Sequence, residues 1–272
     1  MLPSASSDSL DAPFPLTSDA IAFYREQGFV KVPRALPSAI LESYRSEIAR
    51  LMREASVNRP PLNQRSTYDK AFLQMTNLWR RSDLVRQFVF GRRLARLAAE
   101  LMDVRGVRLY HDQALFKEPG GGFTPWHADQ FYWPLSNDNV ITAWIPLVDV
   151  SLEMGPLAFS AGSHRLNYGR DLAISDDSEQ TLTEKLTSYP MERSAFALGD
   201  VSFHSGWTFH RAGPNQTGRM REVFTIIYMD QEIRLIQPRH KNHEADRAAF
   251  APGIEVGEVM ASELNPLLYS AT

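Results

Sequence analysis

The sequence predicts a mainly β protein with flanking helices, in which antiparallel strands form a sandwich or jelly roll. Residues 17–104 show mostly helical periodicity, with apolar residues recurring every three or four positions. From Val107 onward, short runs rich in β-branched and aromatic residues are separated by Gly, Pro, Asn and Asp. Because these runs do not alternate with helical patterns, an antiparallel fold is favoured over an α/β fold.

A chain of 272 residues is long enough to bury a sizeable core and to form one large β domain. We therefore expect a single domain over residues 1–272. Its expected parts are a Ser/Pro/Asp-rich mobile leader at 1–16, a mostly helical support at 17–104, a jelly-roll core at 105–230 and a C-terminal extension at 231–272.

Charge and composition limit the partners. The 29 Lys and Arg and 32 Asp and Glu are interspersed, so no basic face for nucleic acid is expected. A small-molecule substrate and a monomer or homodimer are expected instead. Because cysteine is absent, any metal must be held by His, Asp or Glu. The N-terminus has no signal-peptide pattern and no run is long enough to span a membrane, which predicts a cytoplasmic protein without membrane contact.

The N-terminal helices are predicted from caps and periodicity. Residues 17–27 have helical spacing, with Thr17 or Ser18 available as the N-cap and Gly28 as the stop. A longer amphipathic helix is expected at 37–55, with an apolar face made of Ile40, Leu41, Tyr44, Ile48 and Leu51. The other elements expected before residue 105 are a strand at 29–33, a loop at 58–70 and a helix at 91–102.

The jelly-roll core is expected to contain four clear strand-forming runs, at 107–117, 140–150, 196–205 and 221–230. The polar stretch 172–186 is interpreted as an insertion between strands that contains a helical turn. Near the C-terminus, His240, His243 and Asp246 share one face at helical spacing. Their polar surroundings favour a solvated helix over a second metal site.

The pair His127 and Asp129 carries the first chemical signal. On a strand, residues two apart point to the same face and stand roughly 6–7 Å apart, so both side chains would reach one metal ion. With His210 they supply two imidazoles and one carboxylate, the donor set of the facial triad that holds non-haem Fe(II). Taken alone, an H-x-D pair also fits a strand-end histidine beside a surface acid.

His210 and Arg221 are expected to meet across a β-hairpin. A Gly-Pro-Asn turn follows His210, and the next strand begins at Arg221, so the hairpin would place both residues at the mouth of a barrel. His204 competes as third imidazole and is expected instead to pack or form a hydrogen bond within the barrel wall. Arg219 competes with Arg221 and is expected to be the solvated arginine.

Three runs of this chain occur in the order typical of one enzyme family. They are FKEPGGGFTPWHAD, ITAWIPLVDVSLEMGPLAFSAGSH and GDVSFHSGWTFHRAGPNQTGRMR. Through them, residues 105–230 resemble the phytanoyl-CoA dioxygenase family of Fe(II)/2-oxoglutarate-dependent oxygenases. The resemblance implies a double-stranded β-helix, the cupin-like jelly roll, with flanking helices. It also implies an enzyme that uses Fe(II), 2-oxoglutarate and O2.

The same resemblance assigns catalytic roles to four residues. His127, Asp129 and His210 would bind iron, and Arg221, eleven residues after the last histidine, would bind the far carboxylate of 2-oxoglutarate. Arginine offers that carboxylate a planar, bidentate and permanently charged partner, which lysine does not. His164, in the AGSH element, is expected to have a structural role.

Other residues are expected to line the site. Gln113 and Lys117 share one strand face with His111, so Gln113 is expected to contact 2-oxoglutarate, while Lys117 either faces the site or closes a surface salt bridge. Thr142 shares an inward face with Trp144, and a contact with the co-substrate is expected for it too. One or two of the aromatic residues near the ligands should shape the substrate pocket, although most should be core: Trp126, Phe131, Tyr132, Trp133 and Trp207.

The expected reaction is oxidation of an unactivated C–H bond of a small molecule, with release of succinate and CO2. Hydroxylation, desaturation, epimerisation and cyclisation all fit. Ala128 stands where phytanoyl-type members commonly carry glutamine, which argues against phytanoyl-CoA as substrate. Asp129 argues against halogenation, which needs a small residue there. The alternatives are a non-catalytic ligand-binding jelly roll that kept its metal, and a cupin-like metalloenzyme without 2-oxoglutarate; neither needs Arg221.

Overall fold

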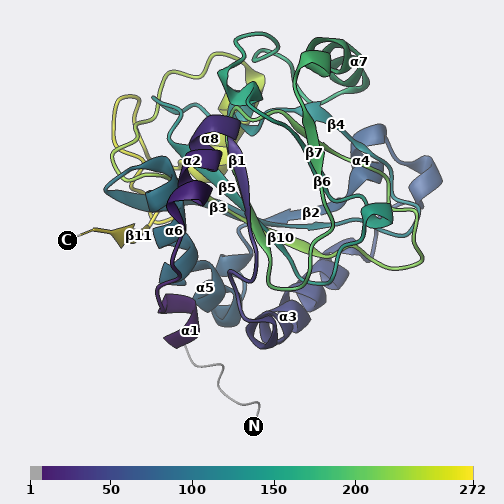
Figure 1. The fold of residues 1–272 in the computed structure, drawn as a ribbon, viewed down its shortest axis with the longest axis horizontal. Coiled ribbons are helices and arrows are strands. Elements are labelled where there is room, and N and C mark those ends of the chain that lie inside the picture. The colour runs from purple at the N-terminus through teal and green to yellow at the C-terminus, as the bar shows by residue number, and fades with distance from the viewer. Residues whose placement is uncertain (1–7, 272) are drawn as a thin grey trace.

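The computed structural model describes residues 8–271, whose strands form two antiparallel sheets (Figure 1). The larger sheet has the order β1, β8, β5, β10, β3, β11, with β2 also paired to β3; the smaller has the order β4, β9, β6, β7. The larger sheet contains β1 (Phe29–Val32), β2 (Leu73–Thr76), β3 (Gly106–Phe116), β5 (Val140–Pro146), β8 (Val201–Ser205), β10 (Val223–Asp230) and β11 (Leu267–Ser270). The smaller contains β4 (Thr124–His127), β6 (Leu157–Ser160), β7 (Met191–Arg193) and β9 (His210–Ala212).

Helices flank the sheets, as the sequence predicts. The α-helices are α1 (Asp8–Asp11), α2 (Ser18–Gln27), α3 (Ser38–Ser56), α4 (Thr67–Ala71), α5 (Asp83–Val89), α6 (Arg92–Met102), α7 (Asp176–Lys185) and α8 (Lys241–Phe250). Short 3-10 helices are η1 (Leu62–Gln64), η2 (Leu78–Arg80), η3 (Asp129–Tyr132), η4 (Leu152–Met154), η5 (Ser163–Arg165) and η6 (Leu186–Ser188). Within residues 8–271, no helix combines the length and apolarity that crossing a membrane requires.

The predicted N-terminal helices are confirmed together with their caps. The Thr17 side chain accepts a hydrogen bond from the backbone N–H of Ala20 at the start of α2, and Gly28 ends that helix at a φ of 82°. Gly28 is also required by space, since a Cβ there would lie 2.5 Å from atoms of His164 and Thr208. The predicted apolar face of α3 is buried throughout.

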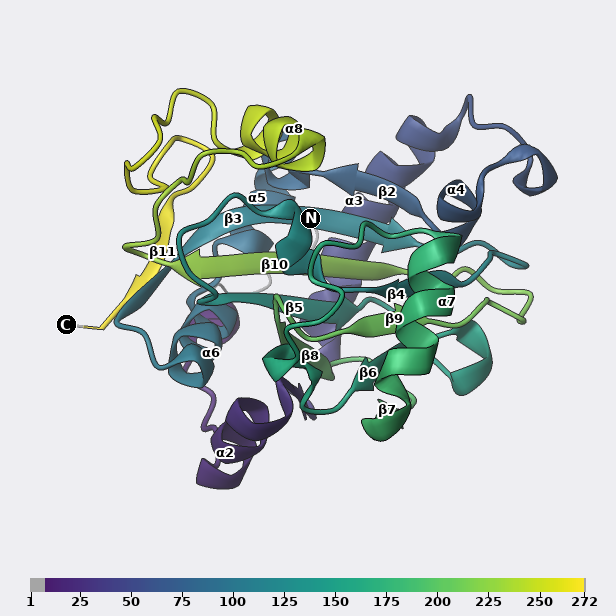
Figure 2. The same ribbon diagram turned by 90° about the horizontal axis from the view of Figure 1, so that it is seen from above.

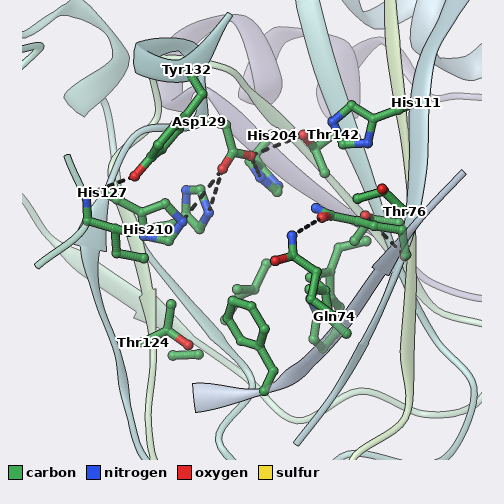
Figure 3. A pocket seen from close by; sticks show the side chains of 18 of the residues that line it. Gln74, Thr76, His111, Thr124, His127, Asp129, Tyr132, Thr142, His204 and His210 are labelled. Carbon is green, nitrogen blue, oxygen red and sulfur yellow. Dashed lines mark hydrogen bonds and ion pairs between the residues drawn. The ribbon is translucent and has the colours of Figure 1, made fainter. Parts of the chain in front are cut away.

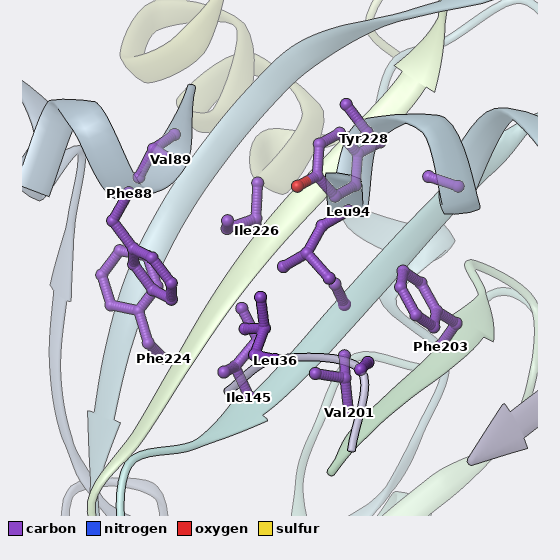
Figure 4. Close-up of a cluster of buried hydrophobic side chains, with 14 of the residues drawn as sticks. Leu36, Phe88, Val89, Leu94, Ile145, Val201, Phe203, Phe224, Ile226 and Tyr228 are labelled. Atoms are coloured by element: carbon purple, nitrogen blue, oxygen red, sulfur yellow. The ribbon is translucent and has the colours of Figure 1, made fainter. Parts of the chain in front are cut away.

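The larger sheet separates two environments because its side chains alternate between its faces. On β5, Ile141, Ala143 and Ile145 belong to the main hydrophobic core, whereas Thr142 and Trp144 line the pocket between the sheets. The core face packs against the flanking helices (Figure 4). The hydrophobic core that they form together includes Leu36, Phe88, Val89, Leu94, Val201, Phe203, Phe224, Ile226 and Tyr228. The pocket therefore lies on the inner face of a sheet whose outer face forms the core.

The insertion at 172–186 supports the smaller sheet. It contains the ten-residue helix α7, which lies beside the edge strand β4 (Figure 2). The Ser178 hydroxyl donates to the carbonyl of Trp126 (3.0 Å), and the Glu179 carboxylate accepts from the N–H of Trp126 (2.8 Å) and pairs with Arg211 of β9 (2.6 Å). Side chains of α7 thus supply hydrogen bonds that an edge strand otherwise lacks.

Several predicted boundaries are wrong. The strand expected at 140–150 ends at Pro146, and the one expected at 196–205 begins at Val201, because Phe196 and Val150 form only an isolated bridge. Helix α4 occupies the end of the predicted 58–70 loop. The predicted hairpin joining His210 and Arg221 is also wrong: β9 pairs with β4 and β6, whereas β10 pairs with β3 and β5 in the other sheet.

The leader expected at 1–16 is only partly described, because residues 1–7 lie outside the described part of the chain. Residues 8–16 do not behave as a free leader. Leu10 is 5% exposed and belongs to the main core, and Asp11 accepts a hydrogen bond from the backbone N–H of Arg92, the first residue of α6. This carboxylate satisfies one of the free donors at the N-terminus of α6.

Replacing Leu10 with Ala is expected to lower the free energy of unfolding by about 2 kcal/mol, because the change leaves a cavity in the core. Urea denaturation followed by circular dichroism would measure the loss. Leu152→Ala, at a side chain that is 42% exposed, is the control and should change stability by less than about 0.5 kcal/mol. Equal, small effects of the two substitutions would show that residues 8–16 are not anchored.

Candidate active site

His127, Asp129 and His210 converge on one point between the two sheets (Figure 3). Strands β4 and β9 pair so that His127 lies directly opposite His210. Asp129 is not on a strand as predicted but begins η3; Ala128 between them is extended, so both side chains still face the same side. Asp129 Oδ1 lies 3.6 Å from His127 Nε2 and 3.8 Å from His210 Nε2. The three donor atoms are therefore close enough together to bind one metal ion.

The backbone fixes both imidazole rings. His127 Nδ1 lies 2.8 Å from the carbonyl oxygen of Pro125, and His210 Nδ1 lies 2.9 Å from that of Thr208. Each Nδ1 therefore carries the proton and donates it, which leaves both Nε2 lone pairs directed toward Asp129. Burial lowers the pKa of each histidine to about 4, so both rings are neutral at pH 7 and able to bind a metal.

The carboxylate of Asp129 is held by its second oxygen. Oδ2 accepts a hydrogen bond from the Thr142 hydroxyl (3.2 Å) and lies 3.3 Å from His204 Nε2. Burial by itself would raise the pKa of Asp129, but His210, His204 and His127 together lower it below its ordinary value. The carboxylate is thus ionised, with Oδ1 left for a metal. His204, expected in the barrel wall, orients Asp129, and Thr142 acts on the same oxygen.

Arg221 is a buried cation without an anionic partner among residues 8–271. It is 2% exposed, it lines the pocket, and its guanidinium lies 5.8 Å from the centre of the Trp144 ring. Nη1 donates to the carbonyl of Gly155, while Nε is buried without any hydrogen bond in the described chain. Burial lowers its pKa to about 9, which still leaves it charged at neutral pH. Arg219, by contrast, is exposed.

Gly155 can approach Arg221 only because it lacks a side chain. Its φ is 70°, and a Cβ at this position would lie 2.2 Å from the carbonyl oxygen of Gly213. Its carbonyl is therefore held against the segment after β9 and faces the guanidinium.

The predictions for Lys117 are wrong. Lys117 pairs with Arg221 across an isolated bridge, but its side chain is completely buried, does not line the pocket and forms no salt bridge in the described chain. Nζ donates to the carbonyls of Gly122 and Gly213, which links the loops flanking β4 and β9. Burial, with a smaller contribution from Arg221, lowers the pKa of Lys117 to about 6. Arg221 is therefore the charged member of the pair.

Both sheets contribute side chains to the pocket that contains these groups. Gln113 and Thr142 line it as predicted, but Gln113 is already engaged by Gln74, whose Nε2 donates to Gln113 Oε1 (2.6 Å). Of the five aromatic residues singled out from the sequence, Tyr132 and Trp133 line the pocket and the other three do not.

With this geometry in view, comparison with known proteins identifies the family. Residues 24–223 match the family model described as "Phytanoyl-CoA dioxygenase (PhyH)", which spans most of the chain. The chain belongs to the phytanoyl-CoA dioxygenase family.

Relatives of this phytanoyl-CoA dioxygenase family member are distant. It is 22% identical over 249 residues to the ectoine dioxygenase of Streptomyces avermitilis, covering 84% of this chain and 83% of that one. It is 29% identical over 128 residues to the probable alpha-ketoglutarate-dependent hypophosphite dioxygenase of Stutzerimonas stutzeri, so this alignment spans only 45% of the length of that relative and of this chain.

Solved structures match over nearly the whole chain. The non-heme alpha ketoglutarate dependent carbocyclase SnoK from nogalamycin biosynthesis has a TM-score of 0.78 at 25% identity and covers 94% of this chain and 98% of its own. The epimerase SnoN from the same biosynthesis has a TM-score of 0.73 at 26% identity, with coverage of 92% and 98%. The predicted double-stranded β-helix is thereby confirmed.

Sequence reasoning missed several pocket residues of this family member. Strand β2 and the segment before it contribute Tyr68, Phe72, Gln74 and Thr76. The alternation of apolar and polar residues at 73–76 is the signal that predicts a strand here. The C-terminal helix was expected to be solvated, but α8 buries His243 and Phe250 and brings Asp246 to the pocket. His164 lies outside the pocket, against Gly28.

Proposed function

We propose that His127, Asp129 and His210 bind Fe(II) and that Arg221 binds the far carboxylate of 2-oxoglutarate, within a chain that acts as one catalytic domain. The protein is an Fe(II)/2-oxoglutarate-dependent oxygenase. Its reaction oxidises an unactivated C–H bond of a small molecule and releases succinate and CO2. Hydroxylation is the simplest outcome, and desaturation, epimerisation and cyclisation use the same machinery.

The proposal depends mainly on Arg221, whose buried charge is unpaired within residues 8–271. Arg221 lines the same pocket as the two neutral histidines and the aspartate that would bind the metal. Desolvating a guanidinium costs several kcal/mol unless an anion compensates. No carboxylate within residues 8–271 forms a salt bridge with Arg221, and Nε has no acceptor. A dicarboxylate with one end at the metal and the other at Arg221 supplies that anion.

Each side chain then has one task. The two histidines present fixed Nε2 atoms, and His204 and Thr142 hold Asp129 so that Oδ1 alone faces the metal position. Arg221 orients the co-substrate by a bidentate contact. When bound, iron, 2-oxoglutarate and O2 supply the oxidising chemistry. The side chains bind and orient these reactants and exclude water around them.

The two alternatives are disfavoured by the same arginine. A cupin-like metalloenzyme without 2-oxoglutarate and a ligand-binding jelly roll both leave a buried Arg221 unexplained. The matching carbocyclase and epimerase structures are described as alpha ketoglutarate dependent, which supports the oxygenase assignment at 25% and 26% identity.

Anaerobic addition of Fe(II) and 2-oxoglutarate is expected to produce a weak visible charge-transfer band, because the keto acid chelates the metal held by His127, Asp129 and His210. Absorption spectroscopy under argon would detect it. Succinate, which lacks the keto group, should give no band. A protein that binds Fe(II) but shows no band with 2-oxoglutarate would favour the metalloenzyme that does not use this co-substrate.

A further inference from the structure

The pocket has a second end that the metal and 2-oxoglutarate do not use. Arg221 lies opposite Lys117, just beyond β3, whereas His111 lies six residues earlier on the same strand. At about 3.3 Å per residue, these two positions are about 20 Å apart along the strand. His111 and Thr142 lie on one line across the sheet, since both pair with Ile227. Thr142 contacts Asp129, so the metal donors are level with His111 along the strands but separated from it across the sheet, while Arg221 lies farther along the strands.

Helix α8 closes the second end. His243 Nε2 lies 3.0 Å from the carbonyl oxygen of Phe131, and the His240 ring stacks on the Phe131 ring at 4.5 Å. These contacts hold α8 against η3, which begins with Asp129. Helix α8 follows the stretch matched by the family model, which ends at residue 223. The wall it forms is thus supplied by the C-terminal part of this chain.

Asp246 and Phe250 of α8 form a carboxylate in aromatic surroundings. They are four residues apart, so they lie on the same face of the helix, and both line the pocket. The Tyr110 hydroxyl donates to Asp246 Oδ2. The Phe250 ring stacks on His111 at 4.1 Å, and the Tyr110 ring lies 5.7 Å from those of Phe250 and Trp133. Such a combination of one acid and several rings is suited to a cation.

The ionisable groups that line the pocket are unbalanced at this end. Among the described lining residues, Arg221 is the only Lys or Arg, and Asp246 is the only carboxylate besides Asp129. Asp246 forms no salt bridge within residues 8–271, and Tyr110 is its one hydrogen-bond donor there. Burial raises the pKa of Asp246 to about 8, against a smaller lowering by Tyr110, so the side chain is protonated at pH 7 until a cation beside it lowers this pKa and the carboxylate forms.

We propose that the substrate carries a cationic amino group, attached to an apolar body, and that Asp246 binds this group while the Phe250 and Trp133 rings contact the body. An anionic substrate would find no fixed cation at this end, since Arg221 lies at the other. The register places His111 and Thr142 two strand spacings apart, about 10 Å, so the amino group is remote from the carbon that is oxidised. This inference rests on the proposed function.

Three probes of matched shape test the charge preference. The protein is loaded anaerobically with Fe(II) and 2-oxoglutarate and titrated by calorimetry with 2-phenylethylammonium, 2-phenylethanol or 3-phenylpropanoate. We expect the ammonium to bind about tenfold more tightly than the alcohol and the carboxylate to bind most weakly. An ammonium that binds no more tightly than the alcohol, including the case in which neither binds, overturns the inference.

Two variants assign the preference to Asp246. Asp246→Asn keeps the shape and an acceptor for Tyr110, so it should weaken ammonium binding about tenfold and change alcohol binding less than about twofold. Glu244→Gln, an exposed position on the same helix, is the matched control and should change neither. Equal loss of both probes in Asp246→Asn would mean that Asp246 only supports packing, and would overturn the inference.

The anaerobic charge-transfer band separates this inference from the proposed function. Absence of the band in the unmodified protein contradicts the assignment of iron and 2-oxoglutarate. A normal band without a preference for the ammonium probe contradicts only the role of Asp246. In Asp246→Asn the band should be retained, because Asp246 lies at the pocket end away from Arg221.

Discussion

Replacing Arg221 with Ala is expected to raise the dissociation constant for 2-oxoglutarate at least about thirtyfold, because removing one partner of a buried charge pair costs about 2–5 kcal/mol. Iron binding should change by less than about threefold, since Arg221 makes no contact with the three metal donors. Isothermal titration calorimetry with 2-oxoglutarate, and a separate titration with Fe(II), would measure the two affinities.

The arginine prediction has two informative comparisons. Arg221→Lys keeps a charge but loses the planar fork, so it should recover only part of the 2-oxoglutarate affinity. Arg219→Ala removes the same charge from an exposed site two residues away and should leave both affinities unchanged. If Arg221→Ala weakened iron and 2-oxoglutarate equally, its effect would be on folding of the pocket, and the assigned role would be wrong.

Replacing Asp129 with Asn is expected to weaken Fe(II) binding at least about a hundredfold and to abolish the anaerobic band. Removing a residue that hydrogen-bonds a metal ligand typically lowers metal affinity about 10–100-fold. Removing the one anionic ligand of the three should lower it at least as much. The asparagine keeps the size of the side chain and its contacts with His204 and Thr142. Fe(II) affinity by competition with a chelating dye, and the visible spectrum, would measure the effect.

A matched control for the aspartate prediction is Asp138→Asn, which makes the same charge change at an exposed site. It should retain the band and the thermal midpoint of the unmodified protein. Asp129→Asn should also retain a folded structure, since asparagine has nearly the same size and its side-chain oxygen can still accept from Thr142. A variant at Asp129 that still bound Fe(II) normally would exclude this residue as a ligand.

The predictable part of the fold is the part determined by local signals. The caps Thr17 and Gly28 and the apolar face of α3 depend on residues a few positions apart, and all three are confirmed. Strands β3 and β10 were found because their runs are long, and that of β10 is also rich in β-branched residues. Strand β2 was missed although its apolar and polar residues alternate, and it brings Gln74 and Thr76 to the pocket.

The candidate metal donors could be chosen from the sequence because their chemistry and order carry the information. His127, Asp129 and His210 are brought together as expected, but by a different path. Strands β4 and β9, which carry His127 and His210, lie in one sheet. Arg221 precedes β10, which lies in the other sheet, so the expected hairpin does not exist. Two packed sheets can juxtapose residues that no hairpin joins, and local sequence does not specify which strands pair.

Sequence alone predicted the fold class, which is confirmed, and it proposed the metal donors and an arginine for a dicarboxylate, because residue type and spacing carry those properties. Tertiary structure decided which charges are buried and what they face. Only packing shows that Arg221 is buried with no anionic partner in the described part of the chain, that Lys117 donates to two carbonyls and that Asp246 faces the pocket. The physical reason is that desolvation depends on all neighbours in space, which the chain brings together from distant positions.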